Sequence, residues 1–211
     1  MLPDDEMKAV VDELRGMDPS PLLGSSRSGV RLWAWAEDVA SQLHRRFPAL
    51  GVTVGYLRYP ERVPERHLDF DTHYARIAQL DPTEIGVALD GPLTVACGHD
   101  GHHRLMVTNH SGTPRVLATN GRITAHVVDP STRRVVGIST MAQTMPGVSF
   151  RVAPNESVAI PLVVGTASVD PSLGYTVPAG AWDLQATLSM RDEGETGGLE
   201  YLTPPLRFET V

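Results

Sequence analysis

The chain has 211 residues, 41% of them hydrophobic, and is long enough to bury a core without disulfides. Its 18 Lys and Arg against 25 Asp and Glu give a net charge of -7 without a basic stripe, which argues against a nucleic-acid partner and against an anionic membrane surface. A single cysteine, Cys97, excludes an internal disulfide framework. The amino terminus is acidic and no apolar run has the length of a membrane span, so we expect a cytoplasmic location.

The first part of the chain, residues 1–82, is predicted to be a helical and αβ extension. Residues 4–16 place four apolar side chains on one helical face, which predicts an amphipathic helix. The Ser-, Pro- and Gly-rich residues 18–29 are typical of a linker. A second helix is expected over residues 30–47, followed by a strand over 52–56 and a short helix over 71–80.

The second part of the chain, residues 83–211, has the period of two that is typical of half-buried strands. The clearest case is residues 181–190, where Trp182, Leu184, Ala186, Leu188 and Met190 are expected to point inward. We predict strands over residues 84–90, 92–97, 102–109, 115–118, 122–129, 134–139, 148–152, 157–164, 181–190 and 203–210. Residues 127–136 form the clearest hairpin, since Asp-Pro-Ser-Thr supplies turn residues between β-branched pairs. The fold class is therefore mainly β, an antiparallel β-sandwich with an N-terminal helical and αβ extension.

Several strand and turn segments carry a resemblance to known domains. They are residues 105–109 followed by Ser111-Gly112, the hairpin 128–136, residues 150–154 followed by Glu156-Ser157, and residues 178–182. On these segments, residues 93–210 resemble bacterial immunoglobulin-like domains, including those of the intracellular proteinase-inhibitor type. The whole chain also resembles hypothetical proteins of high-GC actinobacteria, which share the helix–strand stretch 35–55. The resemblance implies an immunoglobulin-like fold and transfers no functional residues.

One cluster of side chains has the composition of a metal or thiol site. Cys97, His99, Asp100 and His102 lie within one short loop and the start of a strand, and three or four such groups can surround zinc. His102 and His103 would point to opposite faces of a strand, and no second half-site follows. The alternative is a polar turn with solvated histidines. Similarly, Cys97 is either a thiolate paired with a histidine or a small hydrophobic residue at a strand end.

Candidate partner-binding residues lie in two places. Trp33 and Trp35 are expected on different sides of the second helix, so that one of them is an exposed anchor for a partner. Leu173 and Tyr175 lie in the long connection 165–178, where they either contact a partner or close the end of the core. The apolar face of the first helix must also be covered, by the sandwich or by a second subunit.

These observations favour a non-catalytic module that binds a protein partner or a second copy of the chain. The alternative is a small metal-dependent or thiol enzyme that uses Cys97, His99 and His102. We expect no catalytic residues and no cofactor under the first hypothesis. Its partner-binding candidates are Trp33, Leu173 and Tyr175.

Overall fold

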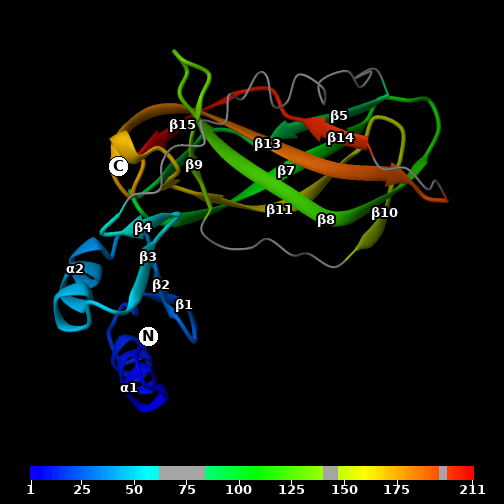
Figure 1. Cartoon of the computed structure of the whole chain (residues 1–211). Coiled ribbons are helices and arrows are strands. Elements are labelled where there is room, and N and C mark those ends of the chain that lie inside the picture. Colours follow the sequence, from blue (N-terminus) through cyan, green and yellow to red (C-terminus); the bar gives the residue numbers. More distant parts are fainter. Residues whose placement is uncertain (62–83, 140–146, 195–198) are drawn as a thin grey trace.

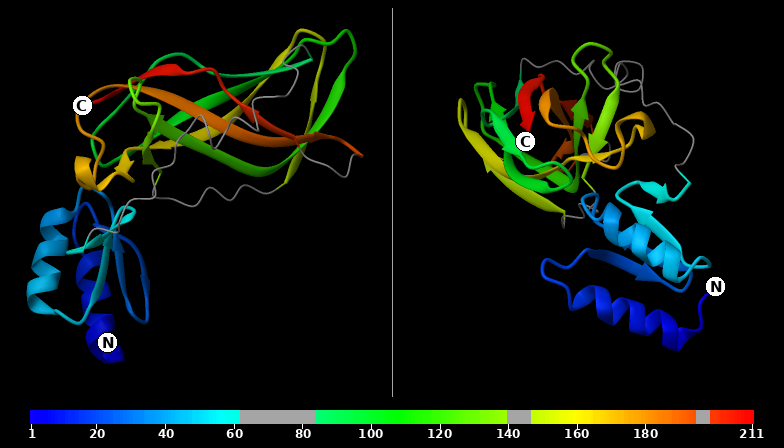
Figure 2. Two further views of the ribbon diagram at one scale, coloured as in Figure 1. Left: turned by 45° about the horizontal axis from the view of Figure 1, so that its top comes forward. Right: turned by 90° about the vertical axis from the view of Figure 1, so that its left-hand side faces the viewer.

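An αβ unit formed by the first 61 residues lies at one end of a β-sandwich (Figures 1 and 2). The computed structural model describes residues 1–61, 84–139, 147–194 and 199–211. The predicted helix over 71–80 and the predicted domain boundary at 82/83 both lie outside these residues. The buried apolar side chains form one large cluster in the sandwich, a second in the αβ unit and a small third around Val128 and Val135.

The αβ unit is a four-stranded sheet with two helices packed on one face. Its elements are α1 (Asp4–Arg15), β1 (Leu22–Ser26), β2 (Gly29–Leu32), α2 (Glu37–Arg46), β3 (Gly51–Val54) and β4 (Leu57–Tyr59). The strands lie in the order β1-β2-β3-β4, and only β2 and β3 are parallel, because α2 carries the chain back between them. The amphipathic helix predicted at residues 4–16 is confirmed as α1, whose Val10, Val11 and Leu14 are buried against the sheet.

Two predictions for this unit are wrong. The expected linker over 18–29 contains β1 and the turn into β2, because its serines and glycines serve as hairpin turn residues. The expected helix over 30–47 begins only at Glu37. Val30, Leu32, Ala34 and Ala36 are all buried, so burial in this stretch follows a period of two. Leu32 and Ala36 are also four residues apart, which is why the same stretch fits a helical spacing.

The sandwich contains an eight-stranded sheet facing a three-stranded sheet. The larger sheet consists of β6 (Leu93–Val95), β8 (Arg115–Val128), β9 (Val135–Ile138), β10 (Val148–Val152), β12 (Ala167–Ser168), β13 (Gly180–Asp192), β14 (Leu199–Leu202) and β15 (Leu206–Thr210). The smaller sheet consists of β5 (Ile85–Leu89), β7 (Asp100–Asn109) and β11 (Ser157–Gly165) in the order β11-β7-β5. All pairs are antiparallel except β15 with β6. The chain is mainly β, with an immunoglobulin-like sandwich as its larger part.

The long pair β8 and β13 is the centre of the sandwich (Figure 1). Leu184, Ala186, Leu188 and Met190 are buried, and Trp182 packs against the same core, as the alternation predicts. The strands predicted at 115–118 and 122–129 are one continuous strand, β8, and both halves pair with β13, with a shift of register between Leu188 and Met190. The short strands β12 and β14 were not predicted.

The predicted hairpin over 127–136 is confirmed. The Arg133 amide donates to the Asp129 carbonyl oxygen at 2.9 Å, and the Ser131 amide donates to the Asp129 side chain at 2.8 Å. Arg133 has a φ of 58°, which closes this turn.

The αβ unit and the sandwich are joined by direct side-chain contacts. Tyr175, from the connection between β12 and β13, is buried in the cluster of the αβ unit and lies 6.2 Å from the Tyr59 ring. In the other direction, the Tyr56 hydroxyl donates a hydrogen bond to the Ser139 carbonyl oxygen of the sandwich. Tyr175 in the connection between β12 and β13 therefore makes an internal contact.

None of the helices in the described ranges has the length and apolar character needed to cross a membrane.

Candidate functional site

The contact between the αβ unit and the sandwich leaves a cavity of about 330 Å³. We call it the junction cavity. The αβ side contributes Trp33 and Trp35, together with Pro19 and Ser20. The sandwich contributes His99, Asp100, His102 and Val163. Two groups of residues that are distant in sequence therefore meet in one cavity.

The two tryptophans are held by a turn between β2 and α2. The Trp33 amide donates to the Pro21 carbonyl oxygen at 3.0 Å, and the Ala36 amide donates to the Trp33 carbonyl oxygen at 3.0 Å. Ala34 and Ala36 are buried on the core side, while Trp33 and Trp35 are both half-buried and line the junction cavity. The prediction that they lie on different sides of a helix is wrong, since this segment is a turn.

Trp35 also contacts the sandwich directly. Its ring stacks on the His99 imidazole with 5.9 Å between ring centroids and 7° between planes. The backbone of Gly98 allows this approach, because a Cβ atom there would lie 2.9 Å from the Trp35 amide nitrogen. Gly98 also has a φ of +78°, which favours glycine. Glycine at position 98 thus allows the αβ unit to approach the sandwich closely at Trp35.

The histidines divide between the two faces of β7. Asp100 and His102 lie two residues apart and share its outer face, where both line the junction cavity. His103 points to the core side with Leu105 and Val107 and is half-buried. Its Nε2 atom has no hydrogen-bond partner in the described structure, and burial lowers the pKa of its imidazole.

Among the described residues that line the cavity, Asp100 is the one acidic group. Burial raises the pKa of its carboxyl group, and a hydrogen bond from the Ser139 hydroxyl at 3.1 Å together with His102 and His99 partly offsets this effect. Burial also raises the pKa of the nearby Tyr56 phenol. The charge of Arg31 lowers this pKa, and the charge of Asp100 raises it further. A partly desolvated carboxylate beside aromatic rings attracts cations, because rings offer their negative faces and water screens poorly there.

The proposed metal set does not converge. Cys97 does not line the junction cavity, and its amide donates to the Val211 carbonyl oxygen at 2.9 Å. Across the described ranges, no three His, Cys, Asp or Glu side chains are grouped so that they could hold a metal ion. His99 and His102 are exposed. Cys97, His99 and His102 therefore do not form a metal-binding group among the described residues.

The three predicted partner-binding residues are placed differently from one another. Trp33 lines the junction cavity, and Leu173 packs, half-buried, against the sandwich core. Tyr175 is only 4% exposed and contacts the cluster of the αβ unit, so its contact is internal. Sequence reasoning did not assign a role to Ser20 or Val163, and neither residue carries a local signal of its own.

No protein-family model and no curated protein matches the chain. Among solved structures, it is similar to the CARDB domain of a Pyrococcus furiosus protein, with a TM-score of 0.32, 10% identity and coverage of 61% of this chain and 93% of that one. A PapD-like domain of human CEP192 gives a TM-score of 0.33, 13% identity and coverage of 63% and 89%. The CooA pilin subunit of enterotoxigenic Escherichia coli gives 0.28, 9% identity and coverage of 60% and 99%. These structural neighbours are immunoglobulin-like, CARDB and PapD-like β-sandwich domains.

Proposed function

We propose that the protein is a non-catalytic interaction module that receives a cationic side chain of a protein partner in the junction cavity. The observation that carries this proposal is the meeting of Trp33, Trp35 and the Asp100 carboxylate in one cavity. Tryptophan has the most favourable face for a cation among the aromatic residues. The part of the cavity lining that the structure describes contains no lysine or arginine that would oppose such a ligand.

The size of the cavity supports a single anchoring side chain. Its volume of about 330 Å³ is at the lower end of the range for small-ligand sites. An arginine guanidinium would stack on an indole and pair with a carboxylate at the same time, and a lysine ammonium would do so less completely. Arginine and tryptophan are also the residue types that dominate binding energy at protein interfaces. A protein partner, association with a second copy and a cytoplasmic location remain predictions from the sequence.

The experiment uses ethylguanidinium chloride as a probe for the full chain labelled with ¹⁵N. We expect the indole N–H signals of Trp33 and Trp35 to shift on titration, and N-ethylurea, a neutral probe of similar shape, to shift them much less. The Trp182 indole is an internal control, because its Nε1 atom donates to the Pro178 carbonyl oxygen at 3.1 Å, outside the cavity lining. Asp100→Asn should remove the response, and Asp12→Asn, on the exposed side of α1, should keep it. Equal responses to the charged and the neutral probe would overturn the proposal.

A further inference from the structure

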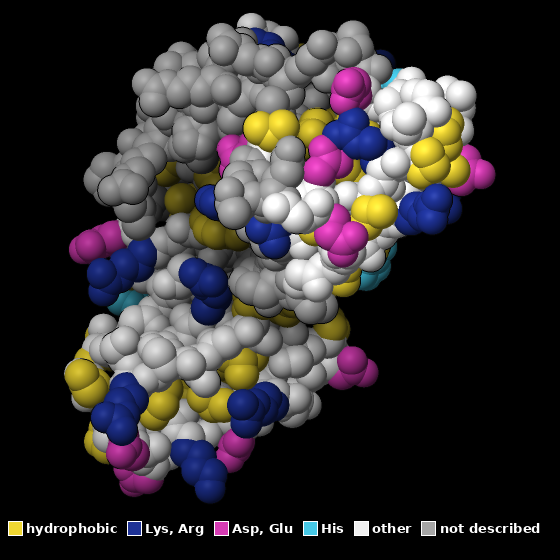
Figure 3. Space-filling view, turned by 90° about the vertical axis from the view of Figure 1, so that its right-hand side faces the viewer, with side chains coloured by type: hydrophobic (Ala, Val, Ile, Leu, Met, Phe, Trp, Pro, Cys, Tyr) yellow, Lys and Arg dark blue, Asp and Glu magenta, His cyan; other side chains and the backbone are white. Residues whose placement is uncertain are grey.

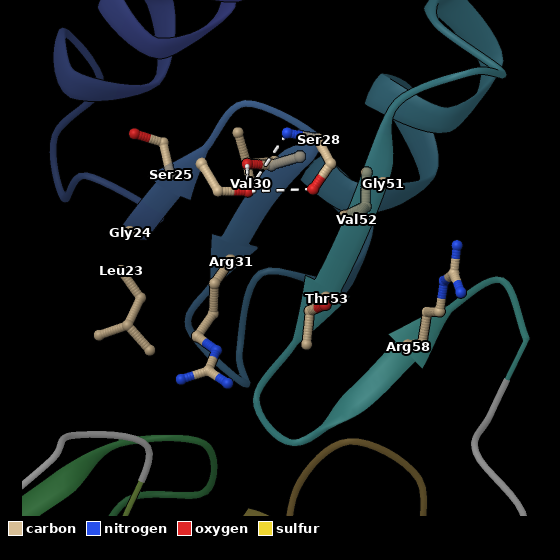
Figure 4. A pocket seen from close by; sticks show the side chains of 12 residues that line it. Leu23, Gly24, Ser25, Ser28, Val30, Arg31, Gly51, Val52, Thr53 and Arg58 are labelled. Atoms are coloured by element: carbon tan, nitrogen blue, oxygen red, sulfur yellow. Dashed lines mark hydrogen bonds between the residues drawn. The ribbon is translucent and has the colours of Figure 1, made fainter. Parts of the chain in front are cut away.

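We propose that the open face of the four-stranded sheet is a second binding site, which holds the phosphate group of a phosphorylated protein segment. A hollow of about 850 Å³ lies on this face. It is lined by Arg31, Arg58, Thr53 and the serines of the β1–β2 hairpin, and it shares no lining residue with the junction cavity (Figure 4). We call it the arginine face.

The pairing of β2, β3 and β4 places polar side chains of this face in one row across the sheet. Arg31 pairs with Thr53 across β2 and β3, and Thr53 pairs with Arg58 across β3 and β4. Residues directly opposite in a sheet share a face, and neighbouring strands are about 4.8 Å apart, so the two arginine backbones are about 10 Å apart. Figure 4 shows Thr53 between the two arginines. Both arginines are exposed, so their side chains are free to turn toward an anion above Thr53.

The two arginines have no acidic partner among the described residues. The structure pairs Arg46 with Glu13 at 2.7 Å, Arg133 with Asp183 at 3.0 Å, and Arg115 with Glu84 at 2.6 Å. By contrast, Arg31 lies over the Tyr56 ring at 5.9 Å, and neither Arg31 nor Arg58 forms an ion pair within the described ranges. Both side chains are exposed. Figure 3 shows Lys and Arg side chains standing out on the αβ unit, below the sandwich.

Hydroxyl groups complete the donor set. Ser26 shares the arginine face by its register with Gly29, and its Oγ atom lies 3.3 Å from that of Ser28. Hydroxyl protons rotate to meet an acceptor, so Ser26, Ser28 and Thr53 add three donors to the two guanidinium forks. A carboxylate has two oxygens and one charge, whereas a phosphate monoester has three free oxygens and a charge near -2. The donor set thus suits a phosphate group better.

The shape and charge of this face favour a phosphate carried by a protein. The hollow is bounded by a flat sheet and exposed arginines, so it cannot enclose a small molecule on most sides as small-ligand sites do. An RNA backbone or an anionic membrane needs a broad basic surface. This chain has a net charge of -7, and the face has two arginines, which match a single phosphorylated residue in an extended segment.

The test compares a degenerate nine-residue peptide library with phosphoserine at its centre and the same library with serine. NMR titration of the full chain should show shifts of the Gly29, Gly51 and Thr53 amides with the phosphorylated library only. Arg31→Gln and Arg58→Gln should each weaken binding by roughly ten-fold or more, as expected for the loss of a charge-assisted contact. Arg151→Gln, on exposed β10 of the sandwich, is the matched control and should bind normally. Thermal unfolding of each variant verifies that it folds.

Three results would overturn the proposal. The first is equal binding of the two libraries, which would mean that the site does not recognise the phosphate group. The second is a response to inorganic phosphate as strong as that to the phosphorylated library, which would indicate a site for a small anion. The third is stronger binding of a single-stranded RNA oligomer or of phosphatidylglycerol vesicles with the same dependence on Arg31 and Arg58. Because the Asp100→Asn variant should bind the phosphorylated library normally, failure of the junction cavity proposal is distinguishable from failure of this one.

Discussion

The Trp35 indole and the His99 imidazole stack nearly in parallel, with 5.9 Å between centroids and 7° between planes. Trp35 belongs to the turn between β2 and α2, and His99 directly precedes β7. This pair is therefore part of the wall of the junction cavity and also part of the contact between the αβ unit and the sandwich. Changes at this contact should affect binding and stability together.

Gly98 should be much less tolerant of substitution than Gly91. Both glycines have a φ of +78°, but an added Cβ at Gly98 would lie 2.9 Å from the Trp35 backbone, and one at Gly91 would meet nothing within 4 Å. We expect Gly98→Ala to lower the free energy of unfolding by about 1–3 kcal/mol more than Gly91→Ala, because only Gly98 adds overpacking to backbone strain. Urea unfolding of the two variants gives this difference. Equal losses would mean that the contact at Trp35 relaxes freely.

Tyr175 should hold the αβ unit on the sandwich. Its ring is buried in the cluster of the αβ unit although it belongs to the sandwich connection. We expect Tyr175→Ala to cost about 3–5 kcal/mol, as for other large buried aromatic residues. Amide hydrogen exchange in β2 and β3 should accelerate more than exchange in β8. The matched variant Leu173→Ala, which removes packing from the sandwich core, should not show this selectivity; uniform acceleration in both variants would contradict the assignment.

Asp100→Asn should stabilise the free protein near neutral pH while it removes cation binding. The pKa of this carboxyl group is raised mainly by burial, so its folded value lies above the unfolded value near 3.8. Ionisation therefore disfavours folding once the pH exceeds the folded value, and this cost vanishes below the unfolded value. We expect a small rise in Tm at pH 7 and no difference near pH 3. A lower Tm at pH 7 would indicate that the hydrogen bond from Ser139 outweighs the desolvation.

His103 should make the protein less stable in acid. Burial lowers the pKa of its imidazole below 6.5, although a hydrogen bond with the Gly91 backbone and the Asp90 charge oppose this shift. The unfolded chain then binds a proton at this imidazole more readily than the folded chain does. The free energy of unfolding is therefore highest while the imidazole is neutral, and it decreases as the pH falls below about 6.5. His103→Gln should reduce the loss of unfolding free energy between pH 7.5 and 5.5. Parallel profiles for both proteins would assign the acid sensitivity to other groups.

The sequence predicted most of the sandwich because burial in a two-layer β-fold repeats with the pleat of each strand. The alternation around Trp182 and Leu188 identifies β13, and the Asp129 turn identifies the β8–β9 hairpin, from neighbouring residues alone. Short strands such as β12 and β14 carry too few residues for any period. The partner of β12, β9, also lies about 30 residues earlier in the chain, whereas β14 pairs with the preceding strand β13.

The αβ unit was harder to predict because its local patterns are ambiguous. Leu32 and Ala36 lie four residues apart, as on one face of a helix, but Val30 and Leu32 also fit a strand alternation, and pairing with β3 decides for the strand. The serine-rich turn was interpreted as a linker for the same reason, since turn residues are common to hairpins and to flexible segments. The predicted division at 82/83 stays a prediction.

The sequence by itself determined the mainly β composition, the helix α1 and the strands whose side chains alternate, since these depend on interactions within a few residues. Only the tertiary structure decided that Trp33 and Trp35 meet His99 and Asp100, and that Arg31 and Arg58 flank Thr53. The first arrangement depends on the docking of one unit against the other, and the second depends on strand register within the sheet of the αβ unit. Such pairings between distant residues leave no local period in the sequence, because each side chain reaches its partner only after the backbone has folded.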